Sequence, residues 1–308
     1  MGCPAGIGPE IVAAAVTAAA PEVRARLVVH GDRGPLERAL AGKPWPREVP
    51  IVEHGFDATA GQPDETAGAA QVAYLESAIA AAQRGEVAAL VTAPISKTWA
   101  RRAGFAFPGH TELLAARFAA PRVAMAFVGP RFRVVLATIH TPLAGVPAEL
   151  TIDGVAAVTH LFADALIGDL GVWRPRLGVV GLNPHAGEGG LIGTDERDVI
   201  APAIEAVRAS RRDLELGGPL VPDAAFRAAL DGRWDGLVAM YHDQALITIK
   251  LIDFDLAVNV TLGLPIVRTS PDHGTAYDLA GSGKARADSF AAALALADQI
   301  VQRRAARA

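Results

Sequence analysis

Residues 177–190, LGVVGLNPHAGEGG, join a short apolar run to a glycine-rich turn that carries His185. Two more segments have the same form, VVLATIHTP with His140 and GLVAMYHDQ with His242. Short apolar runs bounded by turns are typical of buried strands, and open α/β sheets bind ligands at the carboxyl ends of their strands. The three segments therefore predict an α/β fold with a functional site at one edge of its sheet.

The rest of the chain alternates strand and helix patterns. We predict helices at 9–20, after Gly34, at 66–83, near Lys97, after FPGHTE, at 151–167, 195–210 and 222–231, and two final helices, the last at 286–304. We predict strands at RLVVHGD, near Ile51, and at VAALVTAP, VAMAFVG, FRVVLATIH, LGVVGL, GLVAMY, VNVTL and PIVRTS. Only Pro130 and Arg131 separate Gly129 from Phe132, so the two runs there are expected to form a hairpin. This pattern predicts an α/β sheet with a mixed edge.

Composition limits the class of protein. With 308 residues, 51% of them hydrophobic, the chain can bury a large core and is expected to form two lobes. The net charge of −4 gives no basic surface for nucleic acid. Cys3 is the only cysteine, which excludes an internal disulfide and fits a reducing cytoplasm. The apolar run IVAAAVTAAA stops at Pro21, so we expect no membrane span. The N-terminus has no basic segment followed by an apolar one, so we expect no signal peptide.

The first residues form an unusual start. Met1-Gly2-Cys3-Pro4 enters the turn GIGPE with no strand before it. A turn of this kind normally follows a strand. We therefore expect a first strand ahead of residue 1, with a miscalled start codon as the simplest cause of its loss.

The three strand-end histidines predict one divalent-metal site, because neutral imidazole is the commonest metal ligand. Taken singly, each is better explained as a hydrogen-bonded structural residue. Taken together, with Asp243 beside His242, they favour a metal. Asp243 and Asp223 are candidates for orienting a ligating imidazole or for a catalytic base. Three other histidines do not follow a strand in this way and are expected on the surface or on helices: His30, His54 and His160.

Two turns could hold anions. In GLNPHAGEGG the glycines let backbone N–H groups approach a phosphate or pyrophosphate. The alternative is a flexible surface loop. We favour the anion site, because such a loop rarely carries a histidine and a glutamate, here His185 and Glu188, directly after a buried strand. The turn lacks the G-x-G-x-x-G fingerprint. In FPGHTE, His110 and Thr111 begin a helix, and an anion pocket and a simple N-cap explain them equally well.

Lys250, Asn259 and Arg268 lie in the apolar stretch KLIDFDLAVNVTLGLPIVRTS. Cations rarely enter such surroundings without an anionic partner. A phosphate or carboxylate ligand would serve as that partner. The alternative is an internal ion pair with Asp253 or Asp255.

Several long motifs resemble the 4-hydroxythreonine-4-phosphate dehydrogenase family of the vitamin B6 pathway: PAGIGPE, TAPISK, FPGHTE, ATIHTPL, GLNPHAGEGG, AMYHDQ and VNVTLGLPIVRTSPDHGTAYDLAGSGKA. The resemblance runs from residue 4 almost to the end. It implies a two-lobed α/β/α fold like that of isocitrate and isopropylmalate dehydrogenases, with a mixed sheet and an active site in the interlobe cleft at a homodimer interface. The implied lobes are 1–112 with 262–308 for NAD, and 113–261 for metal, substrate and dimerisation. One departure is Cys3, where the family usually has an acidic residue.

The resemblance also implies NAD or NADP and one divalent metal (Zn, Mg, Co or Mn). The implied metal ligands are His140, His185 and His242, the last from the partner chain. The implied substrate-binding residues are His110 and Thr111, with three more from the partner chain that suit a phosphate: Lys250, Asn259 and Arg268. The segment DHGTAYDLAGSGKA is similar to the adenine-side NAD loop of those dehydrogenases. Expected cofactor contacts are Gly187, Glu188, Asp272, His273, Gly274 and Thr275, and candidates for the catalytic base are Asp243, Asp223 and Lys97.

The implied reaction oxidises 4-phosphohydroxy-L-threonine to 2-amino-3-oxo-4-phosphobutanoate, which decarboxylates to 3-amino-2-oxopropyl phosphate for pyridoxine 5'-phosphate biosynthesis. Alternative substrates are D-threonate or D-erythronate 4-phosphate, or a cis-dihydrodiol dicarboxylate, and the cations disfavour the last. A phosphate acyltransferase on a similar fold would need no histidine cluster. A catalytically dead binding protein would not need the full set of residues.

Overall fold

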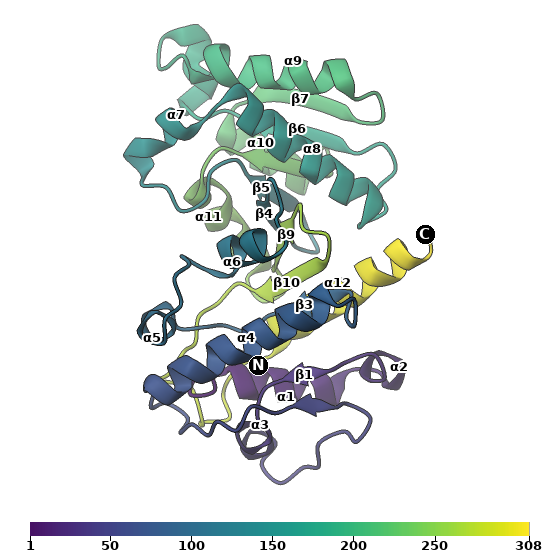
Figure 1. Cartoon of the computed structure of the whole chain (residues 1–308). Helices are drawn as coiled ribbons and strands as arrows, with labels where there is room; N and C mark the ends of the chain where they lie inside the picture. Colours follow the sequence, from purple (N-terminus) through teal and green to yellow (C-terminus); the bar gives the residue numbers. More distant parts are fainter. Residues whose placement is uncertain (308) are drawn as a thin grey trace. The chain divides into compact units, whose positions relative to one another are not determined.

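The computed structural model describes residues 1–307, and the described chain forms two compact units (Figure 1). Unit 1 consists of Met1–Ala120 and Leu264–Val301, and unit 2 of Pro121–Gly263 with the C-terminal residues from Gln302. Both units combine strands with helices, so the predicted α/β class is confirmed.

Unit 1 contains two pairs of parallel strands. One pair is β1 (Val29–His30) with β2 (Ile51–Val52), and the other is β3 (Ala89–Val91) with β10 (Val267–Pro271). Its helices are α1 (Gly8–Ala18), α2 (Pro21–Arg24), α3 (Arg33–Ala39), α4 (Glu65–Gln83), α5 (Lys97–Arg102), α6 (His110–Arg117) and most of α12 (Asp288–Ala305).

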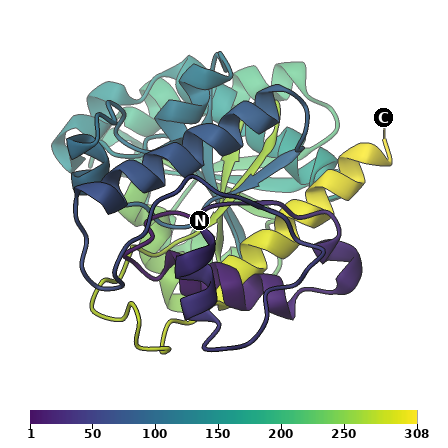
Figure 2. The ribbon, with the colours of Figure 1, turned by 60° about the horizontal axis from the view of Figure 1, so that its bottom comes forward.

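The helices of unit 1 bury their apolar faces on these strands. The long helix α4 contacts both β1 and β3; it starts at Asp64, whose carboxylate accepts the Ala67 N–H at 2.7 Å as an N-cap. Helix α12 packs Ile300 against Val267 of β10. At its other end Phe290 of α12 joins the core formed with α1, and the two helices run side by side in Figure 2.

A buried carboxylate, Asp32, ties the loop after β2 to α4. It is 4% exposed and accepts hydrogen bonds from the N–H groups of His54, Gly55 and Phe56 at 2.7–2.9 Å. The Tyr74 hydroxyl donates a fourth bond at 2.6 Å. Burial alone would raise the pKa of Asp32, but these four donors outweigh it and the pKa lies below its usual value.

We expect Asp32→Asn to lower the free energy of unfolding by about 2–4 kcal/mol at pH 7, because an amide NH2 then faces N–H donors. The folded pKa of Asp32 is depressed, so its stabilisation is present above the unfolded pKa and lost as pH falls through the folded one. The free energy of unfolding of the variant should therefore change less than that of the wild type as the pH falls. Urea unfolding at pH 3 to 7 measures both effects.

The control is Asp57→Asn, which changes an exposed carboxylate paired with Arg38. This substitution should lower the free energy of unfolding by less than about 1 kcal/mol. Equal losses of stability in the two variants would contradict the proposed role of Asp32.

Unit 2 is built on six strands in the order β9-β4-β5-β8-β6-β7. Their bounds are Val258–Leu262, Ala124–Val128, Arg133–Leu136, Gly236–Ala239, Arg176–Val180 and Glu215–Leu220. The helices are α7 (Val146–Glu149), α8 (Ile152–Gly168), α9 (Ala201–Ser210), α10 (Pro222–Leu230) and α11 (His242–Asp253), with short 3-10 turns at Leu143–Gly145 and Pro184–Gly190 and a π turn at Glu196–Ile200.

The sheet of unit 2 is mixed, as predicted. Strand β4 runs antiparallel to β5 and β9, while β5, β8, β6 and β7 are parallel, which confirms the hairpin. The antiparallel strand lies between two neighbours rather than at the edge expected, because β9 returns to pair with its other side. Phe162 of α8 covers the face at Gly236. The neighbouring Leu237 belongs to the core shared with α10 and α11 on the opposite face.

Several elements of the structure differ from those expected from the sequence. Strand β7 and helix α11 were missed, because β7 holds Gly-Gly-Pro and α11 is rich in β-branched residues. The first of the two final helices is absent from the described residues, where 272–287 forms turns.

His30 lies half-buried on β1, and its Nδ1 is 2.9 Å from the Ser77 hydroxyl. His54 is half-buried after β2, and only His160 lies on a helix.

Among residues 1–307 no single helix is long and apolar enough to cross a membrane. The bent pair Leu143–Glu149 and Ile152–Gly168, at 93°, meets those criteria only when taken together. Helix α8 of that pair buries Val155, Val158 and Phe162 in unit 2.

Candidate functional site

Three adjacent parallel strands of unit 2 end at the predicted histidines. His140 follows β5, His242 begins α11 after β8, and His185 follows β6. Because these strands are neighbours in the order β5-β8-β6, their carboxyl ends lie at one edge of the sheet. The rings of His140 and His242 are 6.1 Å apart between centroids.

Side chains beside the histidines lock these strand ends together. The Thr138 hydroxyl donates to the Met240 carbonyl at 2.8 Å, which links β5 to β8. Gln244 accepts from the Met240 N–H at 2.7 Å and donates to the Gly181 carbonyl at 2.8 Å, which links β8 to β6. Thr138 and Gln244 were not among the residues predicted from the sequence, although each lies two residues from a histidine already singled out.

The loop after β6 is left-handed over five consecutive residues, from His185 to Gly189, with φ between 46° and 80°. This backbone region costs non-glycine residues roughly 1 kcal/mol or more each. The buried carboxylate of Glu196 holds the loop, because it accepts the Asn183 N–H at 2.7 Å. A Cβ at Gly187 would lie 2.6 Å from Glu196 Oε2, so this glycine allows the loop to approach its own support. The turn presents His185 and Glu188, both exposed.

Two of the histidines have carboxylate partners on one nitrogen. His185 Nδ1 is 2.9 Å from Glu188 Oε2, and His242 Nδ1 is 2.6 Å from Asp243 Oδ1. A carboxylate at Nδ1 fixes the proton there and leaves Nε2 as a lone-pair donor, as for metal-binding histidines. The donor set thus fits a divalent cation. Within residues 1–307 of one chain, however, no three His, Cys, Asp or Glu side chains are close enough to hold one.

The candidate bases fall in different places. Asp243 is bonded to His242, and Asp223 is exposed in the first turn of α10; both belong to unit 2. Lys97 belongs to unit 1, where its Cε is 3.9 Å from the position of a Cβ at Gly109. The geometry singles out none of the three.

Unit 1 contributes a group of cations around His110. Burial, followed by the charges of Arg268, the N-terminus and Lys97, holds the pKa of His110 well below its usual value, so the ring is neutral at pH 7. Arg268 is 4% exposed and donates to the Thr92 hydroxyl at 2.8 Å. Burial lowers the pKa of Arg268 to about 10, although the negative charge of Glu112 acts to raise it. Arg268 therefore stays charged, in surroundings that favour binding of an anion.

Helix α6 settles the capping question raised by FPGHTE. Its N-cap is Gly109, and His110 is the first helical residue. Thr111 is buried at 4% exposure and makes no N-cap bond. The N-cap interpretation of Thr111 is therefore wrong, because the helix begins at His110, two residues before the start that a Thr111 cap would give.

Lys250 and Asn259 lie in unit 2. Lys250 is half-buried on α11. Asn259 lies on β9 opposite Phe127, and its buried Oδ1 has no hydrogen-bond partner among the described residues. Helix α11 and the turn after it expose large apolar side chains: Ile247 at 62%, Leu251 at 81% and Phe254 at 65%. By helical spacing, Lys250 shares their face.

The expected cofactor segment of unit 1 follows β10 and packs on the first turn of the chain. The Thr275 carbonyl accepts the Ile7 N–H at 2.9 Å, and His273 Nδ1 lies 3.1 Å from the Gly274 carbonyl. Tyr277, which was not among the residues predicted from the sequence, places its hydroxyl 3.4 Å from Cys3 Sγ. Burial raises the pKa of Tyr277 to about 12. Asp272 and Gly274 lie in the same irregular stretch.

The chain matches the model of the family described as pyridoxal phosphate biosynthetic protein PdxA over residues 9–297. It is 43% identical over 320 residues to the 4-hydroxythreonine-4-phosphate dehydrogenase of Desulfosudis oleivorans, covering 96% of this chain and 93% of that protein.

Among solved structures, that of the 4-hydroxythreonine-4-phosphate dehydrogenase from Klebsiella pneumoniae is similar with a TM-score of 0.84 and 37% identity, covering 98% of this chain and 96% of that one. Isocitrate dehydrogenase from Methylococcus capsulatus shares the fold alone, with a TM-score of 0.50 and 15% identity over 98% of this chain and 84% of that one. The chain is a member of the PdxA family of pyridoxal phosphate biosynthetic proteins.

Proposed function

We propose that the protein is a 4-hydroxythreonine-4-phosphate dehydrogenase, which oxidises 4-phosphohydroxy-L-threonine with NAD. The observation that carries the proposal is the row of histidines at the ends of β5, β8 and β6, two of them with a carboxylate on Nδ1. This arrangement occurs in a chain that is 43% identical to a relative bearing that name.

His140, His185 and His242 would hold a divalent cation, which when bound stabilises negative charge on the substrate's C3 oxygen. One chain does not bring three donors together, and we propose that His242 of a second chain completes the set. Glu188 and Asp243 keep the Nδ1 proton in place and orient each ring.

The remaining residues bind and position the substrate. Arg268 and neutral His110 of one chain supply donors for an anionic group, together with Thr111, whereas the resemblance implied that Arg268 comes from the partner chain. Lys250 and Asn259 would come from the partner chain. Binding energy from the remote phosphate places C3 for transfer of hydride to the nicotinamide. One of Asp243, Asp223 and Lys97 accepts the alcohol proton. The product is a β-keto acid, which loses CO2 to give 3-amino-2-oxopropyl phosphate.

A homodimer with shared sites accounts for the exposed face of α11. Contiguous apolar side chains on a surface mark an interaction site, and this helix also holds His242 and Lys250. A second copy on that face would meet Lys250 directly. The cofactor contacts at Gly187, Glu188 and residues 272–275, and the cleft between lobes, remain predictions.

A substrate panel tests the proposed function. NADH formation should be fastest with 4-phosphohydroxy-L-threonine. Its kcat/KM is compared with those of D-threonate 4-phosphate, D-erythronate 4-phosphate and a cis-dihydrodiol dicarboxylate, and the ratios measure how strongly the site selects an amino group over a hydroxyl at C2 and a phosphate over a carboxylate. Repeating the assay with NADP in place of NAD shows which of the two nicotinamide cofactors the enzyme uses. A sugar-acid phosphate that outperforms the amino acid, or acyl transfer from acyl-CoA without NAD, would overturn the proposal.

A further inference from the structure

A buried glutamine on α4, Gln71, pairs with the backbone of Ser96. The Gln71 side chain is 1% exposed. Its Oε1 accepts the Ser96 N–H at 2.8 Å, and its Nε2 donates to the Ser96 carbonyl at 3.2 Å. The backbone of Ser96 is extended, with φ −86° and ψ 112°, so its N–H and carbonyl point to the same side. One carboxamide therefore bonds both groups, as a neighbouring strand would.

Ser96 is the residue at which α5 begins. Its hydroxyl accepts the Trp99 N–H at 3.4 Å, and its carbonyl accepts the Ala100 N–H at 2.9 Å as the first bond of the helix. Lys97 follows directly as the first helical residue. The contacts that fix Ser96 therefore also fix the point from which the Lys97 side chain extends.

A glycine of α4 allows α5 to approach closely enough for this pairing. A Cβ at Gly68, one turn before Gln71, would lie 2.5 Å from the Trp99 carbonyl. Glycine inside a helix is less stable than alanine by about 1 kcal/mol. At this position the missing Cβ lets the α5 backbone come within reach of the Gln71 amide, because residues three apart share a helix face.

Lys97 extends from this anchored start toward His110. Its Cε is 3.9 Å from the position of a Cβ at Gly109, the residue before His110. Burial and the charges of Arg268 and the N-terminus lower the pKa of His110 most, and the charge of Lys97 lowers it further. The Lys97 side chain is exposed, so packing does not hold it. Its position depends on its backbone, which Ser96 fixes.

We propose that Gln71 is a positioning residue for the dehydrogenase reaction, which acts through Ser96 to keep Lys97 beside His110. The inference rests on the proposed function, in which Lys97 and His110 belong to the site. Loss of the Gln71 amide would remove two hydrogen bonds from Ser96 and leave its N–H without that partner, which favours movement of the start of α5. A displacement of about 1 Å can lower the rate of an enzyme about a hundredfold.

A double-mutant cycle tests this role. Gln71→Met keeps a side chain of similar size but removes both bonds to Ser96, and it should lower kcat/KM about tenfold. Lys97→Met should lower kcat/KM about a hundredfold. In the Lys97→Met background, Gln71→Met should change kcat/KM less than about twofold, because the residue through which it acts is gone. Amide exchange at Ser96 should become about tenfold faster in Gln71→Met.

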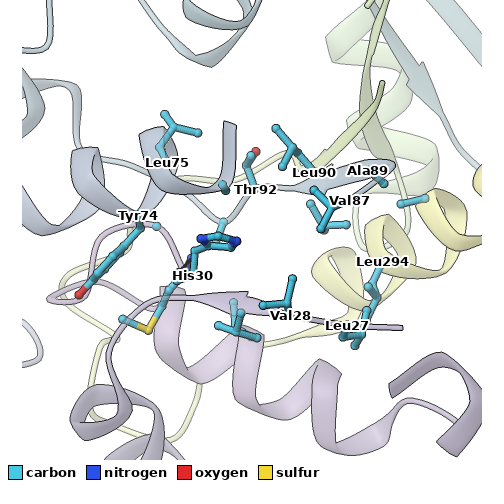
Figure 3. A pocket seen from close by; sticks show the side chains of 18 of the residues that line it. Leu27, Val28, His30, Tyr74, Leu75, Val87, Ala89, Leu90, Thr92 and Leu294 are labelled. Carbon is cyan, nitrogen blue, oxygen red and sulfur yellow. Dashed lines mark hydrogen bonds between the residues drawn. The ribbon is translucent and has the colours of Figure 1, made fainter. Parts of the chain in front are cut away.

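Tyr74 supplies the matched control. It lies one turn after Gln71 on α4, is likewise 1% exposed, and donates its hydroxyl to Asp32. Figure 3 shows this hydroxyl pointing away from Leu90 and Thr92. Tyr74→Phe removes a buried hydrogen bond from the same helix without touching Ser96. It should lower the Tm as Gln71→Met does, but keep kcat/KM within about twofold of the wild type.

The rates are measured with whichever substrate of the panel is oxidised fastest, so a different preferred substrate would overturn the proposed function and leave this test intact. Equal losses from Gln71→Met with and without Lys97 would overturn the positioning role. Wild-type kcat/KM in Gln71→Met or in Lys97→Met would overturn it as well. Gln71→Asn is one methylene shorter and cannot bond both groups of Ser96, so it provides the same cycle if the methionine form does not fold.

Discussion

His185→Ala is expected to reduce turnover about a thousandfold or more while the protein stays folded. His185 is one of the three proposed cation ligands, and deleting a ligand removes the charge that stabilises the developing alkoxide. Its side chain is 68% exposed, so little packing is lost. Steady-state NADH formation and the metal-to-protein ratio after dialysis should fall together, while the Tm changes little.

Two controls accompany this variant. His185→Asn keeps a residue that tolerates the left-handed backbone, and it should be as inactive as the alanine form. His160→Ala, on α8, should retain activity and metal. Turnover that persists in His185→Ala, or in strong chelator, would refute the metal role.

Mixed dimers reveal which chain supplies His242. If it completes the site of the other subunit, mixing inactive His185→Ala with inactive His242→Ala gives one intact site per mixed dimer. Random exchange of subunits makes half of the dimers mixed, and each mixed dimer has one of its two sites intact. The mixture should then recover about a quarter of wild-type activity. No recovery would place all three ligands in one chain, with His140 and His242 at the 6.1 Å ring separation already present.

Arg268→Ala should raise the KM for the phosphorylated substrate at least about 30-fold, equivalent to about 2 kcal/mol or more, with a smaller change in kcat. The guanidinium is buried and charged, and an anionic substrate group supplies its counter-charge in the proposed complex. The comparison of KM with kcat distinguishes uniform binding from a role in the chemical step.

Stability must be separated from binding for Arg268, because its removal leaves Glu112 without that cation. The double variant Arg268→Ala/Glu112→Gln removes the residual charge, and its KM should stay high even where its Tm recovers. Thr92→Val deletes the 2.8 Å bond to Arg268 but keeps the cation, so its KM should rise only a few-fold. An unchanged KM in Arg268→Ala would make this arginine structural.

Local pattern was sufficient for the elements nearest the histidines. Apolar runs of four to six residues before His140, His185 and His242 predicted β5, β6 and β8, and the two-residue gap at Pro130 predicted the β4–β5 hairpin. Both signals act over a few residues, since strand burial and tight turns depend on neighbouring side chains. The sequence alone also determined the fold class and the family motifs.

Other features depended on contacts between distant residues. Helix α11 was not visible locally, because its β-branched residues form a helix only when Ala245, Leu246 and Ile249 pack into the core. The left-handed loop at His185 requires Glu196, and the join between β8 and β6 requires Gln244. Strand order was likewise decided by tertiary structure. The physical reason is that pairing and burial join residues far apart in the chain, whose register no short window of sequence contains.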